Sequence, residues 1–395
     1  KNYYDIDIVA YPDRIYFNNA AADKYELSEM GVFPIYTKLN ADGTINTESE
    51  YTPNIPFAQI GETGYPSLEA AAAAAQAGDE ILLLVNVTLS EELTTPPGIT
   101  LNGNGKQING SITAGGDLTI KGHTKATSFN AGYNQPNITI GAGACLEITG
   151  TGRMVIGHGA TFNITGNITD AKNANVAELT PSLIMPGASF TGAGVTFNVT
   201  NAYISAPSSY CSSSSSASGT FDFNITNSIW KSAGKLAFES QSTAATVNFE
   251  LKDSKLTTGS HLVFGVSRGE VVFDNSNVNV GTSRQIENQS TMTVKNGSVV
   301  NGAVATSSNA KNPGTLIVDN ATYAVTGEFS GSDLGTGTLI IKKGANVSVG
   351  SIEAGANVVV DAEGMAAGDE INFTANLSQF TGTLSVINND KLEAS

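Results

Sequence analysis

A chain of 395 residues with 40% hydrophobic content can bury a sizeable core, while 42 glycines and 14% charged residues favour many short strands and tight turns. The formal net charge of −16 excludes nucleic acid and anionic membranes as favourable partners. No stretch is apolar enough to predict a transmembrane segment. The chain begins at Lys1 rather than Met, so we expect either a processed signal or a trimmed sequence. The expected location is extracellular or at the cell surface, with a signal or lipid anchor removed.

Residues 1–56 differ in texture from the rest, with more aromatic, proline and charged residues. The alternation from Asp5 to Ile8 is typical of a strand. We predict a separate N-terminal extension or small β segment, which either packs on the helix that follows or belongs to a preceding module.

A single helix is predicted at residues 67–77. Ser67 is a suitable N-cap, Glu69 places an acid in the first turn, and the alanine-rich run ends before Gly78. The residues that follow alternate as strands and never return to a helical pattern. We therefore interpret the helix as a cap over the open end of a stack of strands, because exposed sheet edges invite unwanted pairing.

The stretch around this helix resembles the start of right-handed parallel β-helix domains of the pectin lyase-like architecture, found in secreted and surface proteins of gut bacteria. The matching segments are Ile60-Gly61-Glu62, Tyr65-Pro66-Ser67-Leu68, the alanine run, Gly78-Asp79-Glu80-Ile81, Val87-Thr88-Leu89, and residues 99–105. The resemblance implies an all-β fold, a single-stranded right-handed parallel β-helix over residues 57–395.

A repeat can be counted from residue 195 onward, with successive lengths of 26, 26, 22, 21 and 24 residues. Repeats of this length with strand alternation and no helix predict a solenoid in which each coil adds one strand to each face. The predicted core stack inside the tube comprises Phe197, Phe223, Phe249, Val271, Met292 and Leu316.

A polar column follows at a fixed offset of four residues, in spite of the varying repeat length. Asparagine and aspartate tolerate left-handed backbone and can bond to the neighbouring coil, so this column predicts a ladder of turns. The predicted turn ladder comprises Asn201, Asn227, Asp253, Asn275, Asn296 and Asn320.

Trp230 is the only tryptophan and would ordinarily suggest stacking on a sugar ring. It lies three residues after its ladder residue, where the other coils carry apolar side chains, so we predict that it packs in the core. The other members of this column are Ile204, Leu256, Val278, Val299 and Tyr323. Residues 170–189 are predicted to protrude as an excursion, and residues 208–218, rich in serine, to bulge out or form a thin face.

Candidate chemistry is sparse. Gly157-His158-Gly159 resembles one motif of the polygalacturonases, but the Asp-Asp pair and Arg-x-Lys motif that this family also implies are missing, so we interpret His158 as a turn histidine. Asp222 and Glu270 are expected two coils apart, close to 10 Å, at the outer limit for an inverting glycosidase. We interpret them as solvated acids. Alternating charges at 252, 274, 295 and 319 predict a surface ladder of ion pairs.

Metal and cofactor binding are not expected. The histidines His123, His158 and His261 share no column, and neither zinc nor calcium spacing occurs. Cys145 and Cys211 are expected two or three coils apart, roughly 10–14 Å axially. Because a disulfide requires Cα atoms within about 7 Å, two free or buried thiols are predicted.

Three classes of function remain open. The first is a non-catalytic cell-surface or secreted protein with an adhesin-like, structural or display role, whose partner would be a host or microbial glycan or a surface protein. The second is a carbohydrate-binding or polysaccharide-degrading protein, a lyase or glycoside hydrolase with an unrecognised site. The third is a tail-spike or fibre subunit, which a trimeric assembly would favour.

Overall fold

The computed structural model describes residues 56–388, with gaps at 151–153, 192–193, 207–210, 214–217, 240–243, 266–267, 282–285, 303–313, 326–327, 330–336 and 353, together with five strands before residue 52. The chain divides into two compact units, Lys1–Pro56 and Phe57–Ser395. The first contains a five-stranded antiparallel sheet of β1 (Asp7–Tyr11), β2 (Arg14–Asn18), β3 (Lys24–Glu29), β4 (Ile35–Leu39) and β5 (Ile45–Tyr51), paired in chain order.

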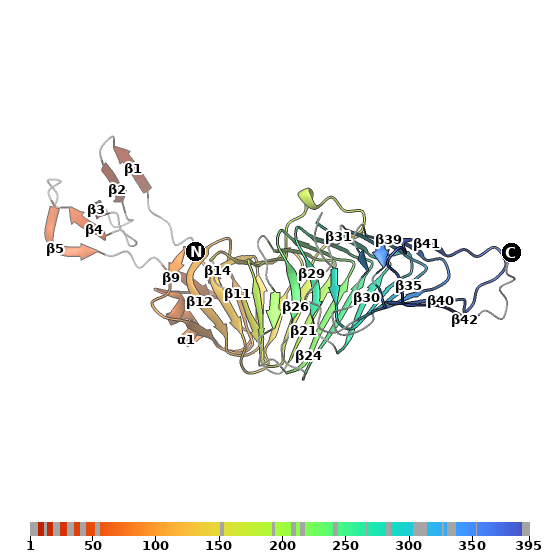
Figure 1. The fold of residues 1–395 in the computed structure, drawn as a ribbon. Helices are drawn as coiled ribbons and strands as arrows, with labels where there is room; N and C mark the ends of the chain where they lie inside the picture. The colour runs from red at the N-terminus through yellow and green to blue at the C-terminus, as the bar shows by residue number, and fades with distance from the viewer. Residues whose placement is uncertain are drawn as a thin grey trace. The chain divides into compact units, whose positions relative to one another are not determined.

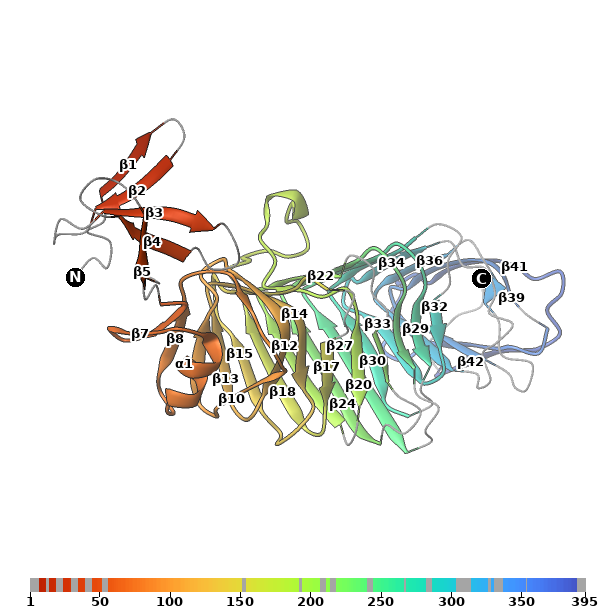
Figure 2. The ribbon, with the colours of Figure 1, turned by 90° about the vertical axis from the view of Figure 1, so that its left-hand side faces the viewer.

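The second unit is a parallel β-solenoid of about 11 turns, which confirms the solenoid predicted from the repeat. Figures 1 and 2 show its coils stacked side by side, coloured in order from orange to blue. Each coil places one strand in a 16-stranded sheet and further strands in an 18-stranded sheet, and three coils add a strand to a 3-stranded sheet. Parallel pairing of each strand with the equivalent strand of the next coil satisfies the backbone groups of the interior.

The 16-stranded sheet consists of β6 (Ala58–Ile60), β7 (Thr63–Tyr65), β8 (Glu80–Leu83), β11 (Ile99–Asn102), β13 (Leu118–Lys121), β15 (Asn137–Ile140), β18 (Ala160–Thr165), β21 (Gly194–Thr200), β24 (Gly219–Thr226), β27 (Ala245–Lys252), β30 (Glu270–Asp274), β33 (Thr291–Lys295), β35 (Thr315–Asp319), β38 (Thr338–Ile341), β40 (Asn357–Asp361) and β42 (Thr383–Ile387). Only β6 pairs antiparallel within it, with β7 and β8.

The 18-stranded sheet consists of β9 (Val87–Thr88), β10 (Leu93–Thr95), β12 (Gln107–Ala114), β14 (His123–Ala131), β16 (Cys145–Ile148), β17 (Met154–Gly157), β19 (Leu183–Ile184), β20 (Ala188–Thr191), β22 (Tyr203–Ala206), β23 (Cys211–Ser213), β25 (Ile229–Ser232), β28 (Lys255–Thr258), β31 (Asn277–Val280), β34 (Val299–Gly302), β36 (Thr322–Val325), β37 (Glu328–Phe329), β39 (Asn346–Ile352) and β41 (Asn372–Asn376). The 3-stranded sheet consists of β26 (Leu236–Glu239), β29 (Leu262–Gly265) and β32 (Ile286–Asn288).

The α-helix of the second unit, α1, spans Leu68–Ala74 and buries Leu68, Ala71 and Ala72. Ser67 is its N-cap, and its Oγ accepts from the Ala70 amide at 3.1 Å. The helix ends three residues before the predicted Ala77, because the Gln76 amide donates to Asp79 Oδ2 at 2.8 Å and closes a turn instead. The helix contacts β6, β7 and β8. No helix among the described residues combines the length and apolar character needed to cross a bilayer.

The six core-stack residues are aligned directly on one another. Phe197 pairs with Phe223, Phe223 with Phe249, and the register continues through Val271, Met292 and Leu316. All six are at most 5% exposed. The phenylalanine rings lie close along the axis, with centroids 6.1 Å apart between Phe197 and Phe223 and 6.0 Å apart between Phe223 and Phe249. Burial of each such side chain contributes about 1.5–3 kcal/mol, so the stack stabilises the tube along its length.

Two sequence predictions about the coils are corrected. The residue in the Trp230 column is Val300 and not Val299, because Gly297, with φ 77°, adds one residue to that corner. The predicted excursion at 170–189 is too long, since β19 and β20 already belong to the sheet. The serine-rich run at 208–218 lies mostly outside the described residues. Its described part includes β23, which pairs with β20.

Candidate functional site

The six predicted ladder residues occupy one corner of successive coils, directly after the strands of the 16-stranded sheet. All six have left-handed backbone, with φ between 43° and 55°. This conformation is unfavourable for most side chains and cheapest for asparagine, aspartate and glycine. The corner beyond Asn320 is taken by Gly344, where an added Cβ would lie 2.8 Å from Asn320 Oδ1.

The ladder side chains form hydrogen bonds between neighbouring coils, but this series of bonds is interrupted along the column. Asn227 Nδ2 donates to Asn201 Oδ1 at 2.8 Å, and Asn275 Nδ2 donates to Asp253 Oδ1 at 2.6 Å. Asn296 instead donates to Asp274 Oδ1 at 2.8 Å, at the corner that Gly297 lengthens. The bonded part of the column therefore holds neighbouring coils together.

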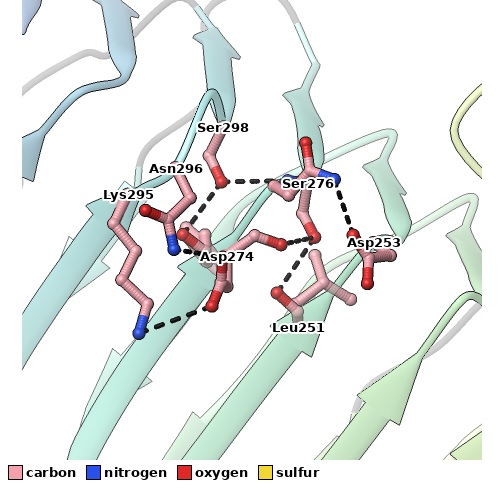
Figure 3. A network of polar contacts seen from close by, with 9 residues as sticks. Leu251, Asp253, Asp274, Ser276, Lys295, Asn296 and Ser298 are labelled. Atoms are coloured by element: carbon pink, nitrogen blue, oxygen red, sulfur yellow. Dashed lines mark hydrogen bonds and ion pairs between the residues drawn. The ribbon is translucent and has the colours of Figure 1, made fainter. Parts of the chain in front are cut away.

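A second column, which sequence analysis missed, runs inside the first (Figure 3). Ser228, Ser254, Ser276 and Ser298 are all fully buried. Each Oγ accepts from a backbone amide of the preceding coil, in the order Ala202, Ser228, Ser254 and Ser276, at 2.9–3.0 Å. Each hydroxyl also donates to a carbonyl, as Ser276 does to Leu251 O at 2.9 Å. We call this column the buried serine ladder.

The signal for the buried serine ladder was present in the sequence. Serine directly follows the corner residue at 228, 254 and 276, and follows Gly297 at 298. Serine is usually found at the surface, so the residue type alone does not indicate burial. Only the register shows that the position points inward.

The charged columns are bonded along the stack in the same way. Of the ladder of ion pairs predicted at 252, 274, 295 and 319, one pair is seen among the described residues, with Lys295 Nζ 3.4 Å from Asp274 Oδ2. Asn248 lies between Asp222 and Glu270, the two acids whose spacing is near the limit for a glycosidase. Its Nδ2 donates to Asp222 Oδ1 at 2.8 Å, and its Oδ1 accepts from the Glu270 backbone amide at 3.3 Å. The side-chain amide of Asn248 thus occupies the position between the two acidic residues, on the coil that separates them.

The excursion packs back over the corner of the turn ladder. It contains a short 3₁₀ helix, η1 (Val176–Glu178). Ala171 N donates to Asn227 Oδ1 at 2.9 Å, and Lys172 Nζ donates to Asn275 Oδ1 at 2.7 Å. A small apolar cluster lies beneath it, formed by Ile168, Ala171, Tyr203 and Ile229.

Trp230 and Cys145 lie in the interior. Trp230 is fully buried between Phe197, Phe238 and Phe249, and its Nε1 has no hydrogen-bond partner among the described residues. Cys145 is a free thiol, and its burial, together with the nearby Glu147 charge, raises its pKa to about 12. The side chain of Cys211 lies outside the described residues.

The three histidines do not converge. His123 Nε2 lies 2.6 Å from Glu147 Oε2 on the next coil, while His158 belongs to a different corner. Among the described residues, no group of three or more histidine, cysteine or acidic side chains is arranged to hold a metal ion.

A shallow depression of about 350 Å³ lies near the C-terminal coils, lined by Asp319, Asn320, Lys343, Gly344, Asp369 and Glu370. Lys343 Nζ lies 2.9 Å from Asp369 Oδ2, and this hydrogen bond lowers the pKa of that carboxyl. The lysine thus pairs with an acid that would otherwise attract a cation.

One pair of aromatic side chains is exposed together. Tyr133 follows β14 and His158 follows β17, and their rings stack with centroids 5.7 Å apart and planes 12° apart. Tyr133 is 59% exposed, and His158 is exposed beside it. His158 has φ 50°, so it does occupy a turn, but it also supports an aromatic ring at the surface. Sequence reasoning missed this pair because the early coils have no regular offsets.

Comparisons with family models, curated proteins and solved structures found no match to this chain. The resemblance to pectin lyase-like proteins therefore stays a prediction, and the function has to be argued from the residues.

Proposed function

We propose that this chain is a non-catalytic secreted or cell-surface protein, in which a right-handed parallel β-helix serves as a rigid rod with an adhesin-like or display role. Right-handed winding is favoured because crossovers between parallel strands of one sheet are right-handed in about 98% of cases. We further propose that α1 caps the first coil, which its contacts with β6, β7 and β8 and its buried Leu68 and Ala71 support.

The observation that carries this proposal is the use of polar side chains between coils. The turn ladder, the buried serine ladder and the Asp222–Asn248–Glu270 column all bond along the stack. A catalytic carboxylate pair requires two acids that face one substrate with room for water between them. Here an amide occupies that place, so the column supports a structural role.

The proposal is tested on the organism that produces the protein and on the purified chain. An antibody against the chain should label intact cells or the culture medium, and the cell-bound signal should fall after protease treatment of intact cells. The purified chain, incubated with acidic and neutral polysaccharides, should release no new reducing or unsaturated ends. Cleavage of any polysaccharide, with loss of that activity in Asp222→Asn or Glu270→Gln, would establish the polysaccharide-degrading alternative instead.

A further inference from the structure

The corner around Tyr133 adopts left-handed backbone at residues other than glycine, whereas Gly98 and Gly269 supply it before β11 and β30. Asn134 and Gln135 follow Tyr133, and both have left-handed backbone, with φ 60° and 47°. On the next coil His158 has φ 50°. Such backbone at residues other than glycine costs free energy and clusters at ligand-binding positions. The turn ladder uses asparagine and aspartate for this conformation, whereas here glutamine and histidine adopt it.

The loop that carries Tyr133 is held at several points. The Gly132 amide donates to Asn130 Oδ1 at 2.8 Å, and Asn134 Nδ2 donates to Gly115 O on the preceding coil at 3.2 Å. Asn137, at the end of the loop, donates through its amide and its Nδ2 to Asp117 Oδ1, both at 2.9 Å. The Tyr133 ring is further fixed by the His158 ring against which it stacks. An exposed aromatic ring held in place loses little conformational entropy when a ligand binds.

We propose that Tyr133 and His158 form a stacking platform for one sugar ring of a neutral glycan, with the Asn134 and Gln135 amides beside it to bond hydroxyl groups. The face of a tyrosine ring carries negative charge density and attracts the polarised C–H groups of a sugar. Both amides are exposed and offer donors and acceptors to hydroxyl groups. The inference rests on the proposed adhesin-like role and deepens it by naming the class of ligand.

Size and charge select this class of ligand. A single aromatic pair is far smaller than the roughly 800 Å² per partner that a stable protein interface buries. It matches one sugar ring. Asp117 is exposed on the preceding coil, and the hydrogen bonds from Asn137 lower the pKa of its carboxyl, so it is ionised at neutral pH. With a net charge of −16 on the chain, an acidic polysaccharide would be repelled and a neutral one would not.

The test measures binding of the full chain to cellohexaose, mannohexaose, maltohexaose and β-1,4-galactohexaose by isothermal titration calorimetry, with polygalacturonate as the acidic comparison. At least one neutral hexaose should bind, and Tyr133→Ala should weaken its binding at least tenfold. Tyr133→Phe keeps the ring and should bind within about threefold of the natural chain. His158→Asn keeps a residue that tolerates left-handed backbone but removes the supporting ring, and should also weaken binding.

Leu377→Ala is the matched control, because Leu377 is an exposed apolar residue on a distant coil. Its binding should equal that of the natural chain, and circular dichroism should show all variants folded. The inference is overturned when no neutral hexaose binds, when polygalacturonate binds as well as the best neutral probe, or when Tyr133→Ala and Leu377→Ala behave alike. A chain that binds none of the probes but is found on the cell surface would overturn this inference alone and leave the proposed function standing.

Discussion

Removal of one hydroxyl from the buried serine ladder should destabilise the coils on either side of it. In Ser276→Ala, the fully buried Ser254 amide loses the acceptor that lies 3.0 Å away, and Leu251 O loses a donor. A buried amide without a partner costs about 1–3 kcal/mol, and the substitution removes a single oxygen, so a cavity adds little. At about 1.4 kcal/mol for each factor of ten, the local opening equilibrium should shift roughly 5- to 150-fold.

Two measurements check this expectation. Urea denaturation can be followed by the fluorescence of Trp230, the only tryptophan, which is fully buried on the coil that carries Ser228. Amide hydrogen exchange should show faster exchange of the Ser254 amide in the variant. Ser348→Ala removes a hydroxyl from an exposed strand position and should change stability by less than about 0.5 kcal/mol. Equal losses of stability in the two variants would refute the assigned role of the buried serine ladder.

Three further predictions concern other parts of the stack. Asn227→Ala should lower the urea midpoint more than Asn227→Gly. Both variants lose the bonds to Asn201 and Ile168, but glycine accepts φ 43° without strain and alanine does not. Equal midpoints would mean that backbone strain is unimportant at this position. Burial tends to raise the pKa of Asp361, but hydrogen bonds from Asn388, the Glu363 amide and Lys342 outweigh it and lower that pKa. The stability that ionised Asp361 provides is therefore present above about pH 4 and is lost as the pH falls through the pKa of the folded state. The urea midpoints of the natural chain and of Asp361→Asn should converge below about pH 4. A difference between the two midpoints that stays constant with pH would contradict this. Burial raises the pKa of Cys145 to about 12, so this thiol should react with a thiol reagent at pH 8 only after unfolding. Rapid labelling of the folded Cys211→Ser variant would contradict this, because Cys145 is the thiol that remains in it.

The regular part of the solenoid could be predicted from sequence because two constraints act at fixed distances. An inward pair must alternate with period two, and the left-handed corner must follow at the same offset, as at Phe223 and Asn227. The remainder of each coil absorbs insertions, so the repeat length varies while these offsets do not. A counted offset fails only where the corner itself changes, which happens at Gly297 and displaces the column from Val299 to Val300.

The candidate site was far less predictable. Tyr133 and His158 lie 25 residues apart in coils whose offsets are irregular, so nothing in the sequence indicated that their rings would meet. His158 was recognised as a turn residue from its glycine neighbours, but a turn position does not reveal what the side chain contacts. The buried serines were equally hidden, since their burial follows from the register and not from the residue type.

The contact of the excursion with the turn ladder has a mechanical consequence. In a simple solenoid each coil contacts only its neighbours, so the stack can lose coils one at a time from an end. Lys172 bonds to Asn275 across 103 residues of sequence, and Ala171 bonds to Asn227 across 56. A force that pulls the chain from its C-terminal side would have to break the Lys172 bond before the Asn275 coil could peel away. The middle of the rod should therefore resist stretching more strongly than the coils beyond it.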